Sequence, residues 1–172
     1  GRHRRELSNA GFEAYLNGAK ESLSAKDSIG RAGTVNSVVY FVVLPAPLKD
    51  EAVRSEYLGT EEIDGNAYYK VRVTFDSEGG GEDHEDVYLY WFDTETYCME
   101  YLAYSFEVND GGTRFRRAFN PRRLNGFLFQ DYVNYRGPAS PDSLKYISEL
   151  YNAGELDSLS VGKIDSLRFL PR

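Results

Sequence analysis

The chain has 172 residues, of which 41% are hydrophobic and 15% aromatic, and its formal net charge at pH 7 is -7. This composition excludes a disordered chain, and the length fits a single domain over residues 1–172 that buries roughly two thirds of its unfolded surface. The negative charge argues against nucleic-acid partners, because a phosphate backbone attracts a positive surface. No apolar run approaches the roughly 20 residues of a membrane-spanning helix, so no membrane span is expected.

The first third of the chain is predicted to hold two helices and one strand. Apolar side chains at three- and four-residue spacing predict a helix over residues 8–25. The segment 30–33 has glycine at both ends and breaks that pattern. Residues 38–44 then form a continuous apolar run that ends at Pro45. Because this run is mostly β-branched and aromatic, it predicts a buried strand. A short helix is expected within residues 48–57.

The next part of the chain is predicted to begin with a β-hairpin. Residues 56–63 and 68–75 flank Asp64-Gly65, and this dipeptide between two strand-like runs is a strong hairpin signal. Along the second run, tyrosine, valine and phenylalanine alternate with polar residues, so Lys70 and Arg72 point away from the apolar side. This alternation predicts a half-buried strand.

The remaining strands and a second helix complete the predicted fold. Ser140-Pro141 is a good helix start, and Gly154 is a good stop. Because the strands are joined by tight turns, they predict an antiparallel meander. The predicted fold class is α+β, with a curved antiparallel sheet (a half-barrel) and a few helices covering its concave side. Further strands are expected over 87–92, 99–106, 114–119, 127–136 and 160–170, with turns at 93–96, 110–112, 120–121 and 125–126.

Residues 87–92 and 99–106 are apolar or aromatic on both faces of their predicted strands. Such a strand is covered on both faces, or one face borders a cavity. Tyrosine offers a flat apolar ring with a polar tip, which suits a lipid or sugar. Alternatively, the rings fill the space between sheet and helices. The candidate ligand-binding residues, with the two arginines for an anionic head group, are Tyr88, Tyr90, Trp91, Tyr101, Tyr104, Arg114, Arg116, Tyr132 and Tyr135. Only part of this set can line one cavity, because the strands have two faces.

Charge is spread unevenly along the chain. Residues 76–95 carry eight acidic side chains and residues 114–123 carry five arginines. The two segments either neutralise each other across neighbouring strands or loops, or the arginines form an anion-binding patch. Asp131 is predicted on an apolar face, where a carboxylate needs a partner, and Arg114 or Arg116 is the natural candidate. The alternative for Asp131 is an acid of a glycoside-hydrolase site.

No motif predicts catalysis. The two histidines are His3, near the terminus, and His84, in an acidic glycine-rich loop, and neither position offers the rigidity that a catalytic base needs. The single Cys98 permits no internal disulfide and no four-ligand zinc site. The loop 79–86 has oxygen ligands that suit calcium, but it lacks the regular calcium-loop spacing, and a solvated hairpin loop is the default interpretation. We therefore expect that the protein is not an enzyme and that it has no cofactor and no metal site.

One set of segments, within residues 36–136, carries a family resemblance. As a set, these segments resemble an uncharacterised family of secreted or lipoprotein-like proteins from Bacteroidetes-type bacteria. The family has no established activity and no assigned catalytic residues to carry over. The matching segments are residues 36–41, 44–45, 57–59, 69–75, 79–83, 90–91, 101–104, 112–116 and 131–135.

The resemblance implies a layout similar to the lipoprotein-localisation-factor fold, an antiparallel half-barrel whose open side is covered by helices. It also implies that the chain lacks some N-terminal edge strands of the family. We therefore expect a non-enzymatic protein of the periplasm or cell envelope, secreted with a signal peptide outside this sequence. The expected partner is a lipid or a lipoprotein acyl chain bound in the half-barrel. The alternative is a protein-interaction or structural module with a filled core and no small ligand.

Overall fold

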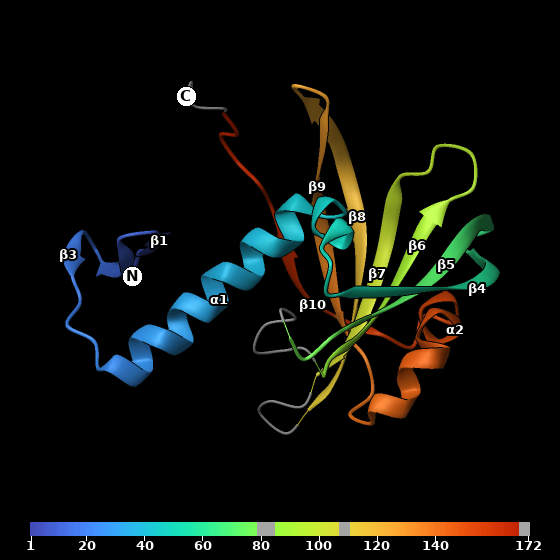
Figure 1. Cartoon of the computed structure of the whole chain (residues 1–172), viewed down its shortest axis with the longest axis horizontal. Helices are drawn as coiled ribbons and strands as arrows, with labels where there is room; N and C mark the ends of the chain where they lie inside the picture. Colours follow the sequence, from blue (N-terminus) through green and yellow to red (C-terminus); the bar gives the residue numbers. More distant parts are fainter. Residues whose placement is uncertain (79–84, 107–110, 169–172) are drawn as a thin grey trace. The chain divides into compact units, whose positions relative to one another are not determined.

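The computed structural model describes residues 1–78, 85–106 and 111–168. The chain forms two compact units, Gly1–Pro47 and Leu48–Arg172, and each is described by itself (Figure 1).

The first unit begins with a small antiparallel sheet, where a helix was predicted over residues 8–25. Strand β1 (His3–Ser8) pairs with β2 (Gly11–Leu16), which pairs with β3 (Ala19–Lys20). The helix prediction is wrong because Asn17-Gly18 closes a two-residue hairpin. Both residues have positive φ, 52° and 89°, as the hairpin turn with the right twist requires.

Helix α1 (Ala25–Val43) follows, so the predicted strand over residues 38–44 is also wrong. Ser24 caps the helix: its side chain accepts a hydrogen bond from the backbone N–H of Asp27 at 3.1 Å. The helix that begins there runs through the glycines at 30–33 and includes most of the apolar run over residues 38–44. Pro45 ends it, because the residue before proline is disfavoured in helical conformation.

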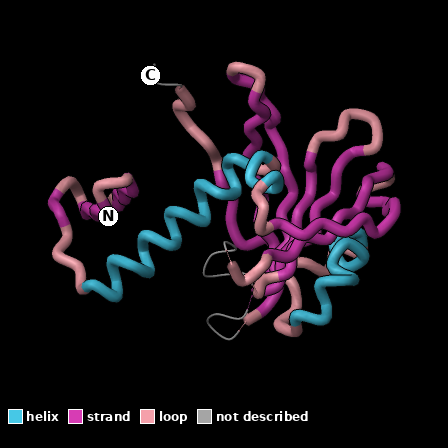
Figure 2. The backbone as a smooth tube through the Cα atoms, viewed as in Figure 1, coloured by secondary structure: helices cyan, strands magenta, loops and turns pink. Residues whose placement is uncertain are grey.

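The second unit is built on one seven-stranded antiparallel sheet in which each strand pairs with the next in the sequence (Figures 1 and 2). The sheet is curved and open, an α+β half-barrel as predicted. The 3-10 helix η2 (Pro141–Tyr146) and helix α2 (Ile147–Asn152) lie between the last two strands in the sequence. The strands are β4 (Val53–Ile63), β5 (Asn66–Phe75), β6 (Val87–Asp93), β7 (Met99–Phe106), β8 (Gly112–Leu124), β9 (Phe127–Arg136) and β10 (Asp157–Gly162).

Several predicted boundaries of this unit shift. The Asp64-Gly65 hairpin is confirmed, with φ of 49° and 79°. The short helix expected within residues 48–57 is replaced by the 3-10 helix η1 (Ala46–Lys49) and the start of β4. The predicted turn at 120–121 lies inside β8, as a register shift against β9. The closing strand spans 157–162 instead of 160–170. Part of the predicted turn at 110–112 lies outside the described residues.

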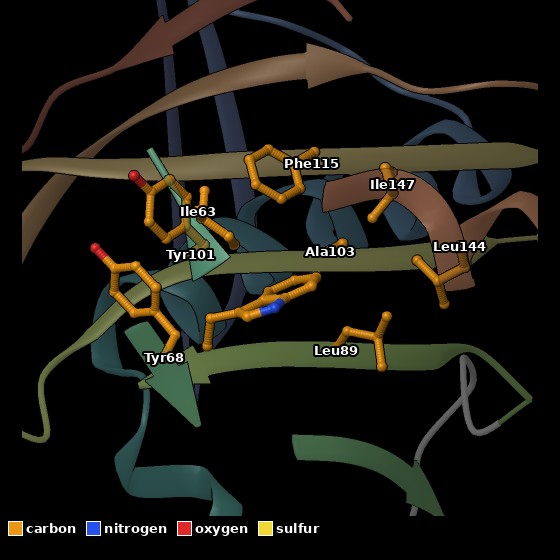
Figure 3. Close-up of a cluster of buried hydrophobic side chains, with 9 residues drawn as sticks. Ile63, Tyr68, Leu89, Tyr101, Ala103, Phe115, Leu144 and Ile147 are labelled. Carbon is orange, nitrogen blue, oxygen red and sulfur yellow. The ribbon is translucent and has the colours of Figure 1, made fainter. Parts of the chain in front are cut away.

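The central strands have two distinct faces. One, which we call the covered face, carries Leu89, Trp91, Ala103 and Phe115, and Leu144 and Ile147 of the two helices pack on it. Figure 3 shows these side chains meeting between the sheet and the helices. The other, which we call the opposite face, carries Tyr88, Tyr90, Leu102 and Tyr104, since side chains alternate along each strand.

The end of α2 is fixed to the β4–β5 hairpin. The side chain of Asn152 accepts a hydrogen bond from the Asp64 N–H at 3.1 Å and donates one to the carbonyl of Glu62 at 3.0 Å. The Tyr151 hydroxyl donates to the Asp64 carboxylate at 3.1 Å. The β4–β5 hairpin, which is distant in the sequence, therefore holds the end of α2 against the sheet.

Candidate ligand-binding site

The nine predicted ligand-binding residues divide between the two faces. Trp91, Tyr101 and Tyr135 lie on the covered face, as the strand register shows. The other six lie on the opposite face, so the set does not line one cavity. These six are Tyr88, Tyr90, Tyr104, Arg114, Arg116 and Tyr132.

On the covered face, the predicted ligand-binding rings pack against the protein's own aromatic side chains. The ring centroids of Phe115 and Tyr151 are 4.6 Å apart and stacked, and the Trp91 ring lies 5.7 Å from Phe115. Tyr101 and Tyr135 both contact the same Phe115–Tyr151 pair. Trp91 is completely buried. The centre of the covered face is therefore core and not cavity.

Hydroxyl groups at one end of this core are held by carboxylates. Tyr101 and Tyr151 both donate to the Asp64 carboxylate, at 3.2 and 3.1 Å, and Tyr68 donates to Glu100 at 2.9 Å. Burial raises the pKa of Tyr101 and of Tyr151 well above the ordinary value, and the negative charge of Asp64 adds to the shift. These phenols are therefore neutral donors that fix the packing.

On the opposite face, tyrosines stack on one another. The Tyr88 ring lies 6.1 Å from Tyr90 and 5.5 Å from Tyr104, stacked on both. Arg116 donates to the Tyr104 hydroxyl at 3.1 Å, and Tyr88 and Tyr90 are buried. Burial raises the pKa of Tyr132 to about 12. These rings form a packed cluster; that they contact a ligand stays a prediction.

The second predicted arginine, Arg114, lies at the edge of the tyrosine cluster. Its guanidinium carbon lies 4.7 Å from the centre of the Phe106 ring, and Nη1 donates to the Thr113 carbonyl at 2.9 Å. In the strand register Arg114 is directly opposite Arg136. Like charges at opposed positions destabilise a sheet. That Arg114 binds an anionic head group is, like the tyrosine contacts, still a prediction.

Asp131 pairs with a different arginine from the one predicted. Its carboxylate accepts hydrogen bonds from Arg122 Nη2 at 2.8 Å, Asn120 Nδ2 at 2.9 Å and the backbone N–H of Ile164 at 3.0 Å. Burial opposes ionisation, but these donors outweigh it and hold the pKa of Asp131 below its ordinary value. Arg114 and Arg116 are not the partners, because their side chains lie on the other face of the sheet.

The acidic and basic segments do not face each other across neighbouring strands, because β7 lies between β6 and β8. Residues 79–84 of the acidic segment lie outside the described residues, so neutralisation between loops stays a prediction. Asp76, at the start of the acidic segment, instead forms an ion pair with Arg54 of β4.

A groove of about 460 Å³ opens on the covered face, beyond the aromatic core. It is lined by strands β4–β7 on one side and by η2 on the other. Leu89 and Leu144 are buried and form its floor together with Val87, while Leu58, 44% exposed, lies at its rim. This volume falls within the range of small-ligand sites.

Three cations and two carboxylates surround the apolar floor. The cations are Lys70, Arg72 and Lys145, and the carboxylates are Glu56 and Asp142. Arg72 Nε forms an ion pair with Glu56 at 3.2 Å, and both side chains are more than half exposed. The groove therefore combines an apolar floor with a charged rim, the arrangement that an amphipathic molecule fits.

Lys70 is committed to contacts within the protein. Its Nζ lies 3.2 Å from both carboxylate oxygens of Glu61, and its side chain is only 12% exposed. The indole N–H of Trp91 donates to the same carboxylate at 2.6 Å, and Lys70 Nζ lies 5.4 Å from the indole ring. The charges of Lys70 and Glu61 therefore compensate each other at the edge of the groove, and Trp91 holds the Glu61 carboxylate in place.

Residues 4–161 match the model of the Family of unknown function (DUF6503). The chain belongs to this family. No match was found among curated proteins or solved structures.

In this DUF6503 member, no group of three potential metal ligands occurs among the described residues. The candidate calcium loop and His84 lie largely or wholly outside them, since the structure leaves out 79–84. No helix in the described ranges is long and apolar enough to cross a membrane.

The sequence reasoning missed the groove because it assigned Lys70 and Arg72 to the solvent side of their strand. Their direction was correct: they point away from Val71 and Val73. That direction, however, is the covered face. The register places Arg72 beside the buried Leu89, which no pattern within β5 reveals. The covering helix comes about 70 residues later, and the groove exists only where it meets the sheet.

Proposed function

We propose that this protein is a non-enzymatic protein of the cell envelope that binds an amphipathic ligand, a lipid or a lipoprotein acyl chain, in the groove beside η2. The observation that supports the proposal is the groove itself. Helices η2 and α2 cover the aromatic centre of the sheet, but next to Leu89 and Leu144 about 460 Å³ is left open. Apolar ligand surface that is buried there is removed from contact with water, and this transfer has a favourable free energy of about 25 cal/mol per Å².

The envelope location rests on the resemblance to secreted, lipoprotein-like bacterial proteins and to the lipoprotein-localisation-factor layout. The half-barrel architecture is compatible with that layout, although a shared architecture is a weak argument for function. Fractionation of the source cells with an antibody against the native protein tests the location. Recovery in the cytosolic fraction would overturn it.

Probe binding tests the ligand site. A fluorescent lipid probe should bind the purified protein at micromolar concentration, and organic extraction followed by mass spectrometry should recover a co-purified amphiphile. Leu58→Glu should weaken probe binding about tenfold, because it places a charge at the rim of the apolar floor.

Leu159→Glu is the matched control. Leu159 is 39% exposed against 44% for Leu58, and each leucine lies at the register shift of its strand, Leu159 in β10 and Leu58 in β4. Probe binding by Leu159→Glu should equal that of the unchanged protein. No probe binding at all, or equal loss in both variants, would overturn the groove as the ligand site.

The filled aromatic centre favours one alternative, an interaction or structural module without a small ligand. The stacked Phe115–Tyr151 pair occupies the space that a deep carrier cavity would need. All six residues of the edge strand β10 are exposed, which leaves one edge of the sheet for a protein partner. Absence of both probe binding and co-purified lipid would favour this alternative.

A further inference from the structure

We infer that the groove selects an amphiphile with an anionic head group, which Arg72 and Lys145 hold at the rim. The inference rests on the proposed function and adds the charge of the ligand. Arg72 extends from β5 and Lys145 from η2, and both line the groove above the floor of Leu89 and Leu144. A chain on the floor therefore places its head group among these side chains.

Arg72 has donors for a second acceptor. A guanidinium has five N–H donors, one on Nε and four on the two Nη atoms. The ion pair with Glu56 is made through Nε. Carboxylate and phosphate groups match the remaining planar fork. Because the pair with Glu56 is exposed, it is weak and does not prevent Arg72 from turning to a ligand.

Lys145 provides a second positive charge. Its side chain is exposed, and Nζ lies 5.0 Å from the ring centre of Tyr146. Within residues 1–78, 85–106 and 111–168, no carboxylate lies at ion-pair distance from it. Lys70 does not take part, because Glu61 already neutralises it.

Two carboxylates at the rim oppose an anion, and this makes the inference specific. Asp142 and Glu56 both line the groove, and Glu56 competes with the ligand for Arg72. Removing the charge of Glu56 should therefore strengthen binding of an anionic amphiphile. Removing the charge of Arg72 or Lys145 should weaken it. None of these three charge removals should affect the binding of a neutral amphiphile of the same chain length.

The test is displacement of the fluorescent probe by dodecanoate and dodecyl phosphate, each below its micelle concentration, and by dodecanol below its solubility limit. Both anions should displace the probe at about tenfold lower concentration than dodecanol. Arg72→Gln and Lys145→Gln should each remove most of that preference, and Glu56→Gln should increase it. A preference between the two anions would support the inference and distinguish a carboxylate source from a phosphate source.

Arg54→Gln is the matched control, because Arg54 is a similarly exposed arginine of the same sheet with its own ion pair, to Asp76, outside the groove lining. It should leave all three displacement curves unchanged, and thermal unfolding midpoints should confirm that every variant is folded. Equal displacement by dodecanol and the anions would overturn the charge selection but leave the proposed function intact. No displacement by any of the three would instead count against the proposed function.

Discussion

Replacing Asp131 by alanine should destabilise the protein by about 3 kcal/mol. The change removes the acceptor of three donors, on Arg122, Asn120 and Ile164. Breaking a buried charge pair costs about 3–5 kcal/mol, and the low end applies because the Arg122 side chain is 29% exposed and can be hydrated. Urea unfolding can be followed by fluorescence, because the single tryptophan, Trp91, is fully buried.

A double-mutant cycle distinguishes the observed partner of Asp131 from the predicted one. Asp131→Ala combined with Arg122→Met should show a coupling energy of about 1–2 kcal/mol, as expected for a hydrogen bond between charged groups. Combined with Arg116→Met, the effects should add to within about 0.5 kcal/mol, because Arg116 lies on the other face. Coupling to Arg116 without coupling to Arg122 would refute the reasoning.

The pH dependence provides a second check on Asp131. Because the pKa of Asp131 in the folded protein is below the ordinary value of 3.8, its carboxylate stabilises the fold at all pH values above 3.8. This contribution is lost as the pH falls below 3.8 through the folded pKa. The stability difference between the unchanged protein and Asp131→Ala should therefore shrink at pH 3. A difference as large as at pH 7 would contradict the argument.

Three further predictions concern the core, the first hairpin and the tyrosine cluster. Phe115→Ala should cost about 3–5 kcal/mol in urea unfolding, because it empties a fully buried ring site, whereas a cost below about 1 kcal/mol would mean that the centre is not packed as described. Gly18→Val should abolish the positive φ of 89° and with it the β2–β3 pairing; unchanged amide exchange protection of β3 would contradict this. Tyr104→Phe should leave displacement of the fluorescent lipid probe unchanged, and a tenfold loss would move the ligand site to the opposite face.

The sequence predicted the second unit better than the first. In the second unit, turn residues such as Asp64-Gly65 and strict alternation along β5 are local signals, and they agree with the long-range pairing. In the first unit the local signals compete. The apolar residues of 12–19 fit both a helix and two short strands, and Asn17-Gly18 decides for the hairpin. Residues 38–44 have the composition of a strand, but they continue a helix that began at its Ser24 cap.

The candidate site was predictable only in part. The apolar and aromatic runs correctly predicted β6 and β7 as strands, and alternation showed that their side chains lie on two faces. Which face is filled depends on where η2 and α2 pack, and nothing in the strands determines this. The partner of Asp131 was missed because the register shift between Phe119 and Arg122 brings Arg122 to its side of the sheet.

The strictly sequential strand order has a consequence for how the second unit folds. Each strand pairs with its neighbour in the sequence, and short turns join β4 to β5, β6 to β7 and β8 to β9, so these hairpins can form at low entropic cost. Asn152 of α2 reaches across the sheet to Asp64, 88 residues earlier, and this contact gains nothing until the strands between them are in place. We therefore expect α2 to dock late in folding, after the hairpins have formed.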